Sequence, residues 1–285
     1  MQQITPELRR WIVEQASAGV RPDDVLTAMR QAGWQEAVAV AAMESALSEH
    51  LAAKQAAAQA ASTTSAVSAV PMLNLAGAPR RLDAGDRWVD VIASLQNPRV
   101  VVLGNLLSEI ECEALIESAR PRLARSLTVQ TQTGGEELNP DRTSSGMFFN
   151  RGETPEVAAL EARIARLVNW PVQNGEGIQV LHYRPGAEYK PHYDYFDPDE
   201  PGTPTILRRG GQRVATLVMY LNEPTRGGGT TFPDVGLEVA PVRGQAVFFS
   251  YDRPHPATRT LHGGAPVIEG EKWVATKWLR EREFV

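Results

Sequence analysis

The segment that decides the fold is QVLHYRPGAEYKPHYDYF, residues Gln179–Phe196, and KWVATKW, residues Lys272–Trp278, follows it far along the chain. Aromatic and β-branched residues are frequent in both segments, which favours strands. Segments of strand character recur through this half of the chain, separated by turns rich in Gly and Pro: Gly177–Tyr183, Arg213–Asn222, Leu237–Ala240, Gln245–Ser250 and Lys272–Leu279. Many short strands with such turns predict a β-sandwich or barrel.

Helix signals precede these strands. After a short apolar strand at Val100–Leu103, Ser108 and Glu111 have the spacing of a capping box, which predicts a helix from there to about Ala119. A second long helix is expected from Thr154 to about Val168. The second half of the chain therefore belongs to the α+β class, with helices packed outside the strands.

The first 52 residues have the pattern of three short helices. Thr5 is a good N-cap before Pro6, and Gly19 and Gly33 end the first two helices. Three helices joined by glycines resemble a ubiquitin-associated-like bundle, but many unrelated units share this pattern. A structural or oligomerising cap, compatible with a homodimer, is therefore the favoured interpretation. We expect a small all-α domain over 1–52, a low-complexity linker over 53–75 and a larger domain over 76–285.

Composition excludes several classes of protein. The chain has 285 residues, a net charge of −5 and a single cysteine, Cys112, so it can form no internal disulfide. An acidic chain with pI near 5.7 disfavours a broad nucleic-acid interface. Its apolar runs fall short of the ~18 residues that a membrane span needs. Since the N-terminus shows no basic stretch followed by an apolar one, we expect a cytoplasmic protein.

One short motif carries candidate metal chemistry. In a strand, residues i and i+2 point to one face, so His192 and Asp194 converge from a single strand. They would supply two of the three ligands of a facial triad, the arrangement that suits non-haem Fe(II). An isolated pair of this kind arises often by chance, and it needs a distal ligand. His255 and His262 are the candidates, and the spacing to Lys272 favours His262.

Lys272 suggests that the site also binds an anionic small molecule besides the metal. Strand alternation places it on one face with Val274, Thr276 and Trp278. A hairpin from His262 to this strand would bring the lysine deep into the barrel. A buried lysine needs an anionic partner or loses its charge. A dicarboxylate that chelates the iron at one end would supply that partner at the other.

The chain resembles a known family in several segments. These are Asn97–Ile116, Arg142–Phe149, Gln179–Phe196, Gly210–Pro233, Pro241–Phe249 and Leu261–Trp278. They resemble the prolyl 4-hydroxylases, within the 2-oxoglutarate- and Fe(II)-dependent dioxygenases, from about Asn97 to Arg280. The resemblance implies a double-stranded β-helix, or jelly roll, flanked by helices. Many relatives have a cysteine shortly after the distal histidine, where this chain has Gly263-Gly264-Ala265; cysteine is no ligand in this chemistry.

By that resemblance, His192, Asp194 and His262 would bind iron, and Lys272 would bind the distal carboxylate of 2-oxoglutarate. Further co-substrate contacts are expected from Tyr183, Thr216 and Tyr220, and substrate contacts from Trp278, Arg142 and Ser144. The implied reaction consumes O2 and 2-oxoglutarate, releases succinate and CO2, and converts a prolyl residue of a peptide or protein into 4-hydroxyproline. Ascorbate is an expected further cofactor.

Other functions stay open at this point. The same oxygenase chemistry could act on a free amino acid or another small molecule. The barrel could also be a catalytically silent binding module, with residues 1–52 recruiting a partner. A zinc hydrolase with the same triad would leave Lys272 unexplained, since a metal-bound water needs no buried cation.

Overall fold

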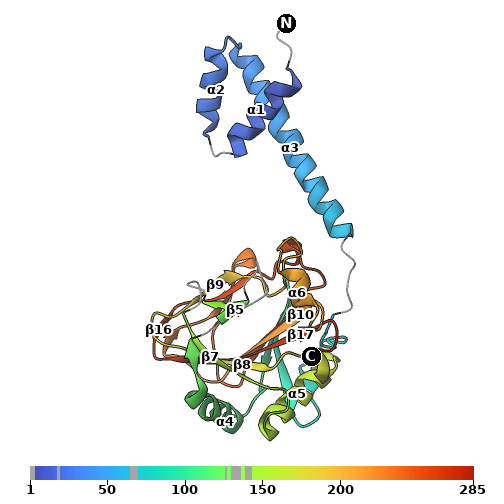
Figure 1. Ribbon diagram of the computed structural model, residues 1–285, viewed down its shortest axis with the longest axis vertical. Coiled ribbons are helices and arrows are strands. Elements are labelled where there is room, and N and C mark those ends of the chain that lie inside the picture. The colour runs from blue at the N-terminus through green and yellow to red at the C-terminus, as the bar shows by residue number, and fades with distance from the viewer. Residues whose placement is uncertain (1–3, 18–19, 65–69, 126, 130–135, 139–142) are drawn as a thin grey trace. The chain divides into compact units, whose positions relative to one another are not determined.

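The computed structural model describes residues 4–17, 20–64, 70–125, 127–129, 136–138 and 143–285 (Figure 1). The chain divides into two compact units, Met1–Ala66 and Val67–Val285. The first unit holds the helices α1 (Pro6–Ser17), α2 (Pro22–Gln31) and α3 (Glu36–Thr64). Their shared core includes Ile12, Met29 and Ala42, which are almost fully buried. That these helices form an independent domain stays a prediction.

Helix α3 differs from the sequence-based expectation. A linker was expected to begin at residue 53, but α3 continues to Thr64. The reason is composition, because residues 53–61 are mostly alanine, the residue with the highest helix propensity. The Ser/Thr cluster that suggested a linker falls at the end of this helix. Among the described helices, none combines the length and apolar character needed to cross a bilayer.

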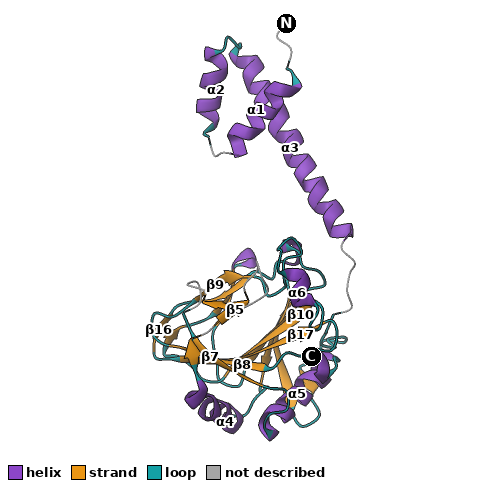
Figure 2. Cartoon of the chain, in the orientation of Figure 1, coloured by secondary structure: helices purple, strands orange, loops and turns teal. Residues whose placement is uncertain are grey.

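The second unit contains the remaining elements, which are mostly strands (Figure 2). Its helices are α4 (Glu109–Ala119), α5 (Pro155–Val168) and α6 (Thr203–Leu207), with short 3-10 turns at Arg120–Arg122, Val172–Asn174, Pro233–Val235 and Pro256–Thr258. Its strands are β1 (Arg81–Asp83), β2 (Trp88–Leu95), β3 (Arg99–Gly104), β4 (Ala124–Arg125), β5 (Leu127–Val129), β6 (Glu136–Leu138), β7 (Ser145–Phe149), β8 (Ile178–Tyr183), β9 (Tyr189–His192), β10 (Arg213–Tyr220), β11 (Arg226–Gly227), β12 (Thr230–Phe232), β13 (Leu237–Val239), β14 (Ala246–Ser250), β15 (His262–Gly264), β16 (Val267–Glu269) and β17 (Lys272–Arg280).

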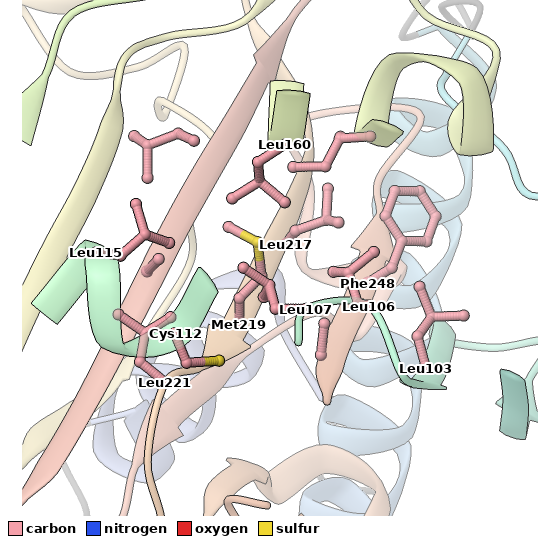
Figure 3. Close-up of a cluster of buried hydrophobic side chains, with 14 of the residues drawn as sticks. Leu103, Leu106, Leu107, Cys112, Leu115, Leu160, Leu217, Met219, Leu221 and Phe248 are labelled. Atoms are coloured by element: carbon pink, nitrogen blue, oxygen red, sulfur yellow. The ribbon is translucent and has the colours of Figure 1, made fainter. Parts of the chain in front are cut away.

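A nine-stranded antiparallel sheet forms the base of this unit, in the order β1-β2-β3-β14-β10-β17-β8-β7-β4. Helices α4 and α5 cover its outer face. There, Cys112 and Leu115 of α4 and Leu160 of α5 pack against Leu217 and Met219 of β10 (Figure 3). The capping box expected at Ser108 is present, since its hydroxyl accepts from the Glu111 N–H and the Glu111 carboxylate accepts from the Ser108 N–H.

A second sheet, in the order β13-β12-β15-β9, faces the other side of the large sheet. The core between them includes Phe232 of β12, Val239 of β13 and, from the large sheet, Tyr220, Val247 and Val274. Two antiparallel sheets packed face to face, with helices outside, agree with the expected jelly roll. The strand segments proposed from sequence correspond to β3, β8, β10, β13, β14 and β17, whereas the β1–β2 hairpin carries no clear sequence signal.

Candidate metal centre

Strand pairing brings the two histidines of the site together. In the small sheet, β15 pairs with β9 in a register that sets His262 opposite His192, and their ring centroids are 4.5 Å apart. Asp194 follows two residues after the end of β9, so the same chain segment delivers the carboxylate. Ligand atoms of these three residues lie within 4.8 Å of one another. In the described part of the chain, they form the one cluster of this kind with metal-binding geometry.

The carboxylate of Asp194 lies between the two imidazoles. Its Oδ1 is 3.6 Å from His192 Nε2, and its Oδ2 is 3.4 Å from His262 Nε2. Asp194 and His262 are 7% and 5% exposed, whereas the His192 side chain is 23% exposed, so the cluster reaches solvent mainly on its His192 side. Burial acts to raise the pKa of Asp194, but the facing imidazoles outweigh it and hold that pKa well below its usual range. The carboxylate is therefore ionised and ready to bind a cation.

Backbone carbonyl groups orient both imidazoles. His192 Nδ1 lies 2.8 Å from the Lys190 carbonyl, and His262 Nδ1 lies 2.9 Å from the Thr260 carbonyl. Since a carbonyl can only accept, each Nδ1 carries a proton, and a bound metal would take the place of any proton on the Nε2 atoms that face Asp194. Burial and the neighbouring His262 also lower the pKa of His192, which favours the neutral, ligating form.

A pocket opens beside the cluster, and Lys272 lies in its wall with all three ligands. Lys272 is 4% exposed, and its Nζ lies 5.4 Å from the centre of the Tyr183 ring. Burial lowers the pKa of Lys272 to about 8, although the charge of Glu238 opposes the change. The ammonium group is thus poorly compensated, and an anion that enters the pocket would stabilise its charge.

The residues of β17 alternate between the pocket wall and the core, as the sequence predicted. Lys272, Val274, Thr276 and Trp278 of β17 all line the pocket, whereas Trp273 and Ala275 point into the core under the helices. Trp278 is covered on one ring face by the Arg213 guanidinium, 4.1 Å from the ring centre. Arg213 in turn donates two hydrogen bonds to Glu176, at 2.7 and 2.9 Å.

The other residues singled out from sequence lie in different places. Tyr183 lines the pocket. Thr216 donates to Asp194 Oδ2 at 2.7 Å, and Tyr220 donates to Thr230, itself a pocket residue, at 2.8 Å. Ser144 is buried just before β7, and Arg142 lies outside the described residues. The alternative ligand His255 caps a 3-10 turn through its Nδ1 and takes no part in the cluster.

Sequence reasoning missed two aromatic residues at the site. Tyr189 stacks on His192 with ring centroids 3.7 Å apart. Tyr251 lies 3.0 Å from the Thr216 hydroxyl through its own hydroxyl group. Alternation was the available signal for Tyr251, because it continues the inward face of Val247 and Phe249 just beyond β14.

Comparison with known proteins places this site in a family. The profile of the 2OG-Fe(II) oxygenase superfamily matches residues 178–280. Prolyl 4-hydroxylase 5 of Arabidopsis thaliana is 42% identical, over 70% of this chain and 74% of the relative. The chain belongs to the prolyl 4-hydroxylase family. Prolyl 4-hydroxylase 1 of the same plant is 44% identical, and the match covers 65% of this chain and 70% of that relative.

A solved structure of the prolyl hydroxylase fold agrees. The viral collagen prolyl hydroxylase of Paramecium Bursaria Chlorella virus-1, crystallised with 2OG, is similar with a TM-score of 0.51 and 30% sequence identity. The match covers 64% of this chain and 95% of the viral one. Like the other members of its family, the chain is a 2-oxoglutarate-dependent dioxygenase.

The residues of this prolyl hydroxylase homologue fit the two groups that the family uses. Two imidazole nitrogens and a carboxylate are a donor set suited to Fe(II), and three protein ligands would leave further positions on the metal for co-substrates. Lys272 would neutralise the far carboxylate of 2-oxoglutarate, which explains a buried ammonium that a hydrolytic zinc site would not need.

Proposed function

We propose that this chain hydroxylates a prolyl residue of a peptide or protein at C4, with Fe(II), 2-oxoglutarate and O2. The observation that carries the proposal is the cluster of His192, Asp194 and His262 beside the buried Lys272 in one pocket. The names of its relatives support the choice of proline. Ascorbate as a reductant, a cytoplasmic location and a homodimer remain further parts of the proposal.

When bound, the iron and co-substrates supply the oxidation, in which one oxygen atom enters a C–H bond and 2-oxoglutarate becomes succinate and CO2. The chain's own task is to bind, orient and exclude water. His192, Asp194 and His262 would hold the metal at the wall of the pocket. Lys272 would bind the far carboxylate of the dicarboxylate and so orient the co-substrate in the pocket.

Trp278 forms part of the pocket wall. Its indole N–H has no hydrogen-bond partner among the described residues, although the atom is buried. A peptide backbone offers carbonyl groups that can accept from such a donor. Arg213 keeps the indole ring in place by stacking on it. This wall therefore suits a peptidyl substrate with a polar backbone.

The experiment that tests the proposal measures succinate release over a panel of proline-containing peptides, with mass spectrometry of the peptides. We expect one added oxygen per succinate. His262→Ala should abolish both signals, while His255→Ala, which alters a histidine outside the cluster, should leave both in place. Succinate formation with a free amino acid alone would contradict the peptidyl substrate. No succinate with any peptide or small molecule would favour a binding module.

A further inference from the structure

Asp194 is the metal ligand least constrained by the sheet. His192 and His262 sit opposite each other in paired strands, but Asp194 lies beyond the last residue of β9. A carboxylate can rotate about its terminal torsion, since such torsions are broad. Something other than strand pairing must hold the two oxygens of Asp194 toward the imidazoles.

Two consecutive hydrogen bonds connect this carboxylate to Thr216 and Tyr251. The Thr216 hydroxyl lies 2.7 Å from Asp194 Oδ2, and the Tyr251 hydroxyl lies 3.0 Å from the Thr216 oxygen. An ionised carboxylate can only accept hydrogen bonds, so the Thr216 hydroxyl must donate its single hydrogen to Asp194. Tyr251 must then be the donor to Thr216. The two hydrogen bonds therefore run from Tyr251 to Thr216 and from Thr216 to Asp194.

Rigid elements hold both donors. Thr216 lies within β10, paired with Phe249 of β14 on one side and with Trp278 of β17 on the other. The Tyr251 N–H donates to the Val214 carbonyl of the same β10 strand. Thr216 and Tyr251 are 0% and 2% exposed, so water cannot replace either hydrogen bond.

The charges around Tyr251 keep it a donor. Burial and the charge of Asp194 raise the pKa of its hydroxyl well above the ordinary value, while Thr216 and Arg213 oppose the change. A phenol that stays protonated polarises the Thr216 hydroxyl and strengthens the second hydrogen bond.

We propose that Thr216 and Tyr251 are positioning residues of the metal centre, which fix the rotation of the Asp194 carboxylate and thereby raise the affinity for the metal. The Thr216 hydroxyl donates a hydrogen bond to Oδ2 of Asp194. The other carboxylate oxygen, Oδ1, then faces His192. The proposal rests on the metal site of the proposed function but not on its substrate. It assigns the Thr216 hydroxyl to Asp194 rather than to the co-substrate.

A matched control exists in the same unit. Tyr220 donates to Thr230 at 2.8 Å, and both residues are as deeply buried as Tyr251 and Thr216. This second Tyr–Thr pair makes no hydrogen bond to a metal ligand among the described residues, and a titration with Co(II) alone does not involve the co-substrate contact expected of Tyr220. Tyr220→Phe therefore removes an equivalent buried hydrogen bond without touching the carboxylate.

The test is calorimetric titration of the metal-free full-length chain with Co(II) alone, together with the visible d–d spectrum of the bound ion. Thr216→Val should weaken Co(II) binding by about 10–100-fold, the usual effect of losing an outer partner of a ligand. Tyr251→Phe should weaken it less, and Thr216→Ser should restore the native affinity and spectrum. Tyr220→Phe should leave both unchanged, although its melting temperature falls.

Native affinity in both Thr216→Val and Tyr251→Phe would overturn the proposal, and so would an equal loss in Tyr220→Phe. If Thr216→Val fails to fold, Tyr251→Phe and Thr216→Ser decide the question, because each changes few atoms. Since the titration contains neither co-substrate nor peptide, a failed hydroxylation assay would leave these results standing and would count only against the proposed function.

Discussion

Replacing Lys272 with methionine should stabilise the chain in the absence of 2-oxoglutarate. The folded state lowers the pKa of Lys272 from 10.5 to about 8, chiefly through burial. At neutral pH the protein therefore carries a charged lysine at a penalty of about 3 kcal/mol. Methionine has a similar length and keeps the apolar contacts, but it gives up the interaction with the Tyr183 ring, about 1 kcal/mol. The net gain is about 1–3 kcal/mol.

The pH dependence has a definite sign. Because the folded pKa lies below that of the unfolded chain, the penalty is fully present below pH 8. It shrinks as the pH rises from about 8 toward 10.5, where both states lose the proton. Native chain and Lys272→Met should therefore differ most at pH 7 and converge at alkaline pH.

Denaturant unfolding at pH 7 and pH 9.5, without metal or co-substrate, measures this difference. Lys272→Arg is the control, since it retains a charge and should show no gain. The same Lys272→Met substitution should weaken 2-oxoglutarate binding by about 30-fold or more, as expected when one partner of a buried charge pair is lost. A methionine variant less stable than the native chain at pH 7 would refute the reasoning about an uncompensated buried ammonium.

Three further predictions concern Lys272 and two other buried groups. For Lys272 itself, the Kd for 2-oxoglutarate should rise about tenfold from pH 7 to pH 9 in calorimetry, because only the protonated lysine attracts the dicarboxylate; a flat profile would contradict this. Cys112, whose thiol pKa burial raises to about 11, should resist iodoacetamide at pH 8 until denaturant is added, and rapid labelling of the folded chain would contradict its burial. Lys277 and Glu161 form a buried ion pair at 2.5 Å, so Lys277→Met alone should cost about 3–5 kcal/mol in unfolding free energy, while adding Glu161→Leu should restore most of it; a double variant no better than the single one would contradict this.

Local patterns in the sequence were enough to predict much of the large sheet. The period of two in β17 correctly separated Lys272 and Trp278, which line the pocket, from Trp273, which enters the helix-covered core. The capping box at Ser108 predicted the start of α4 because its spacing satisfies two backbone donors at once. Such features depend on neighbours within a few residues.

Contacts between distant segments could not be predicted in the same way. The position of Thr216 behind Asp194 depends on how β10 lies against the end of β9, which no local pattern encodes. Tyr251 reaches the site only because β14 pairs with β10. The length of α3 was misjudged for a different reason, since serine and threonine near a helix end were interpreted as the linker itself.

The most direct test of the account is to run the reaction under 18O2 with Fe(II), 2-oxoglutarate and a proline-containing peptide, and to locate the label by fragmentation and NMR. The account predicts one 18O on C4 of a prolyl residue, one 18O in succinate, and no product from Asp194→Ala. Turnover by Asp194→Ala, or a label confined to a small molecule while every peptide stays unmodified, would contradict it.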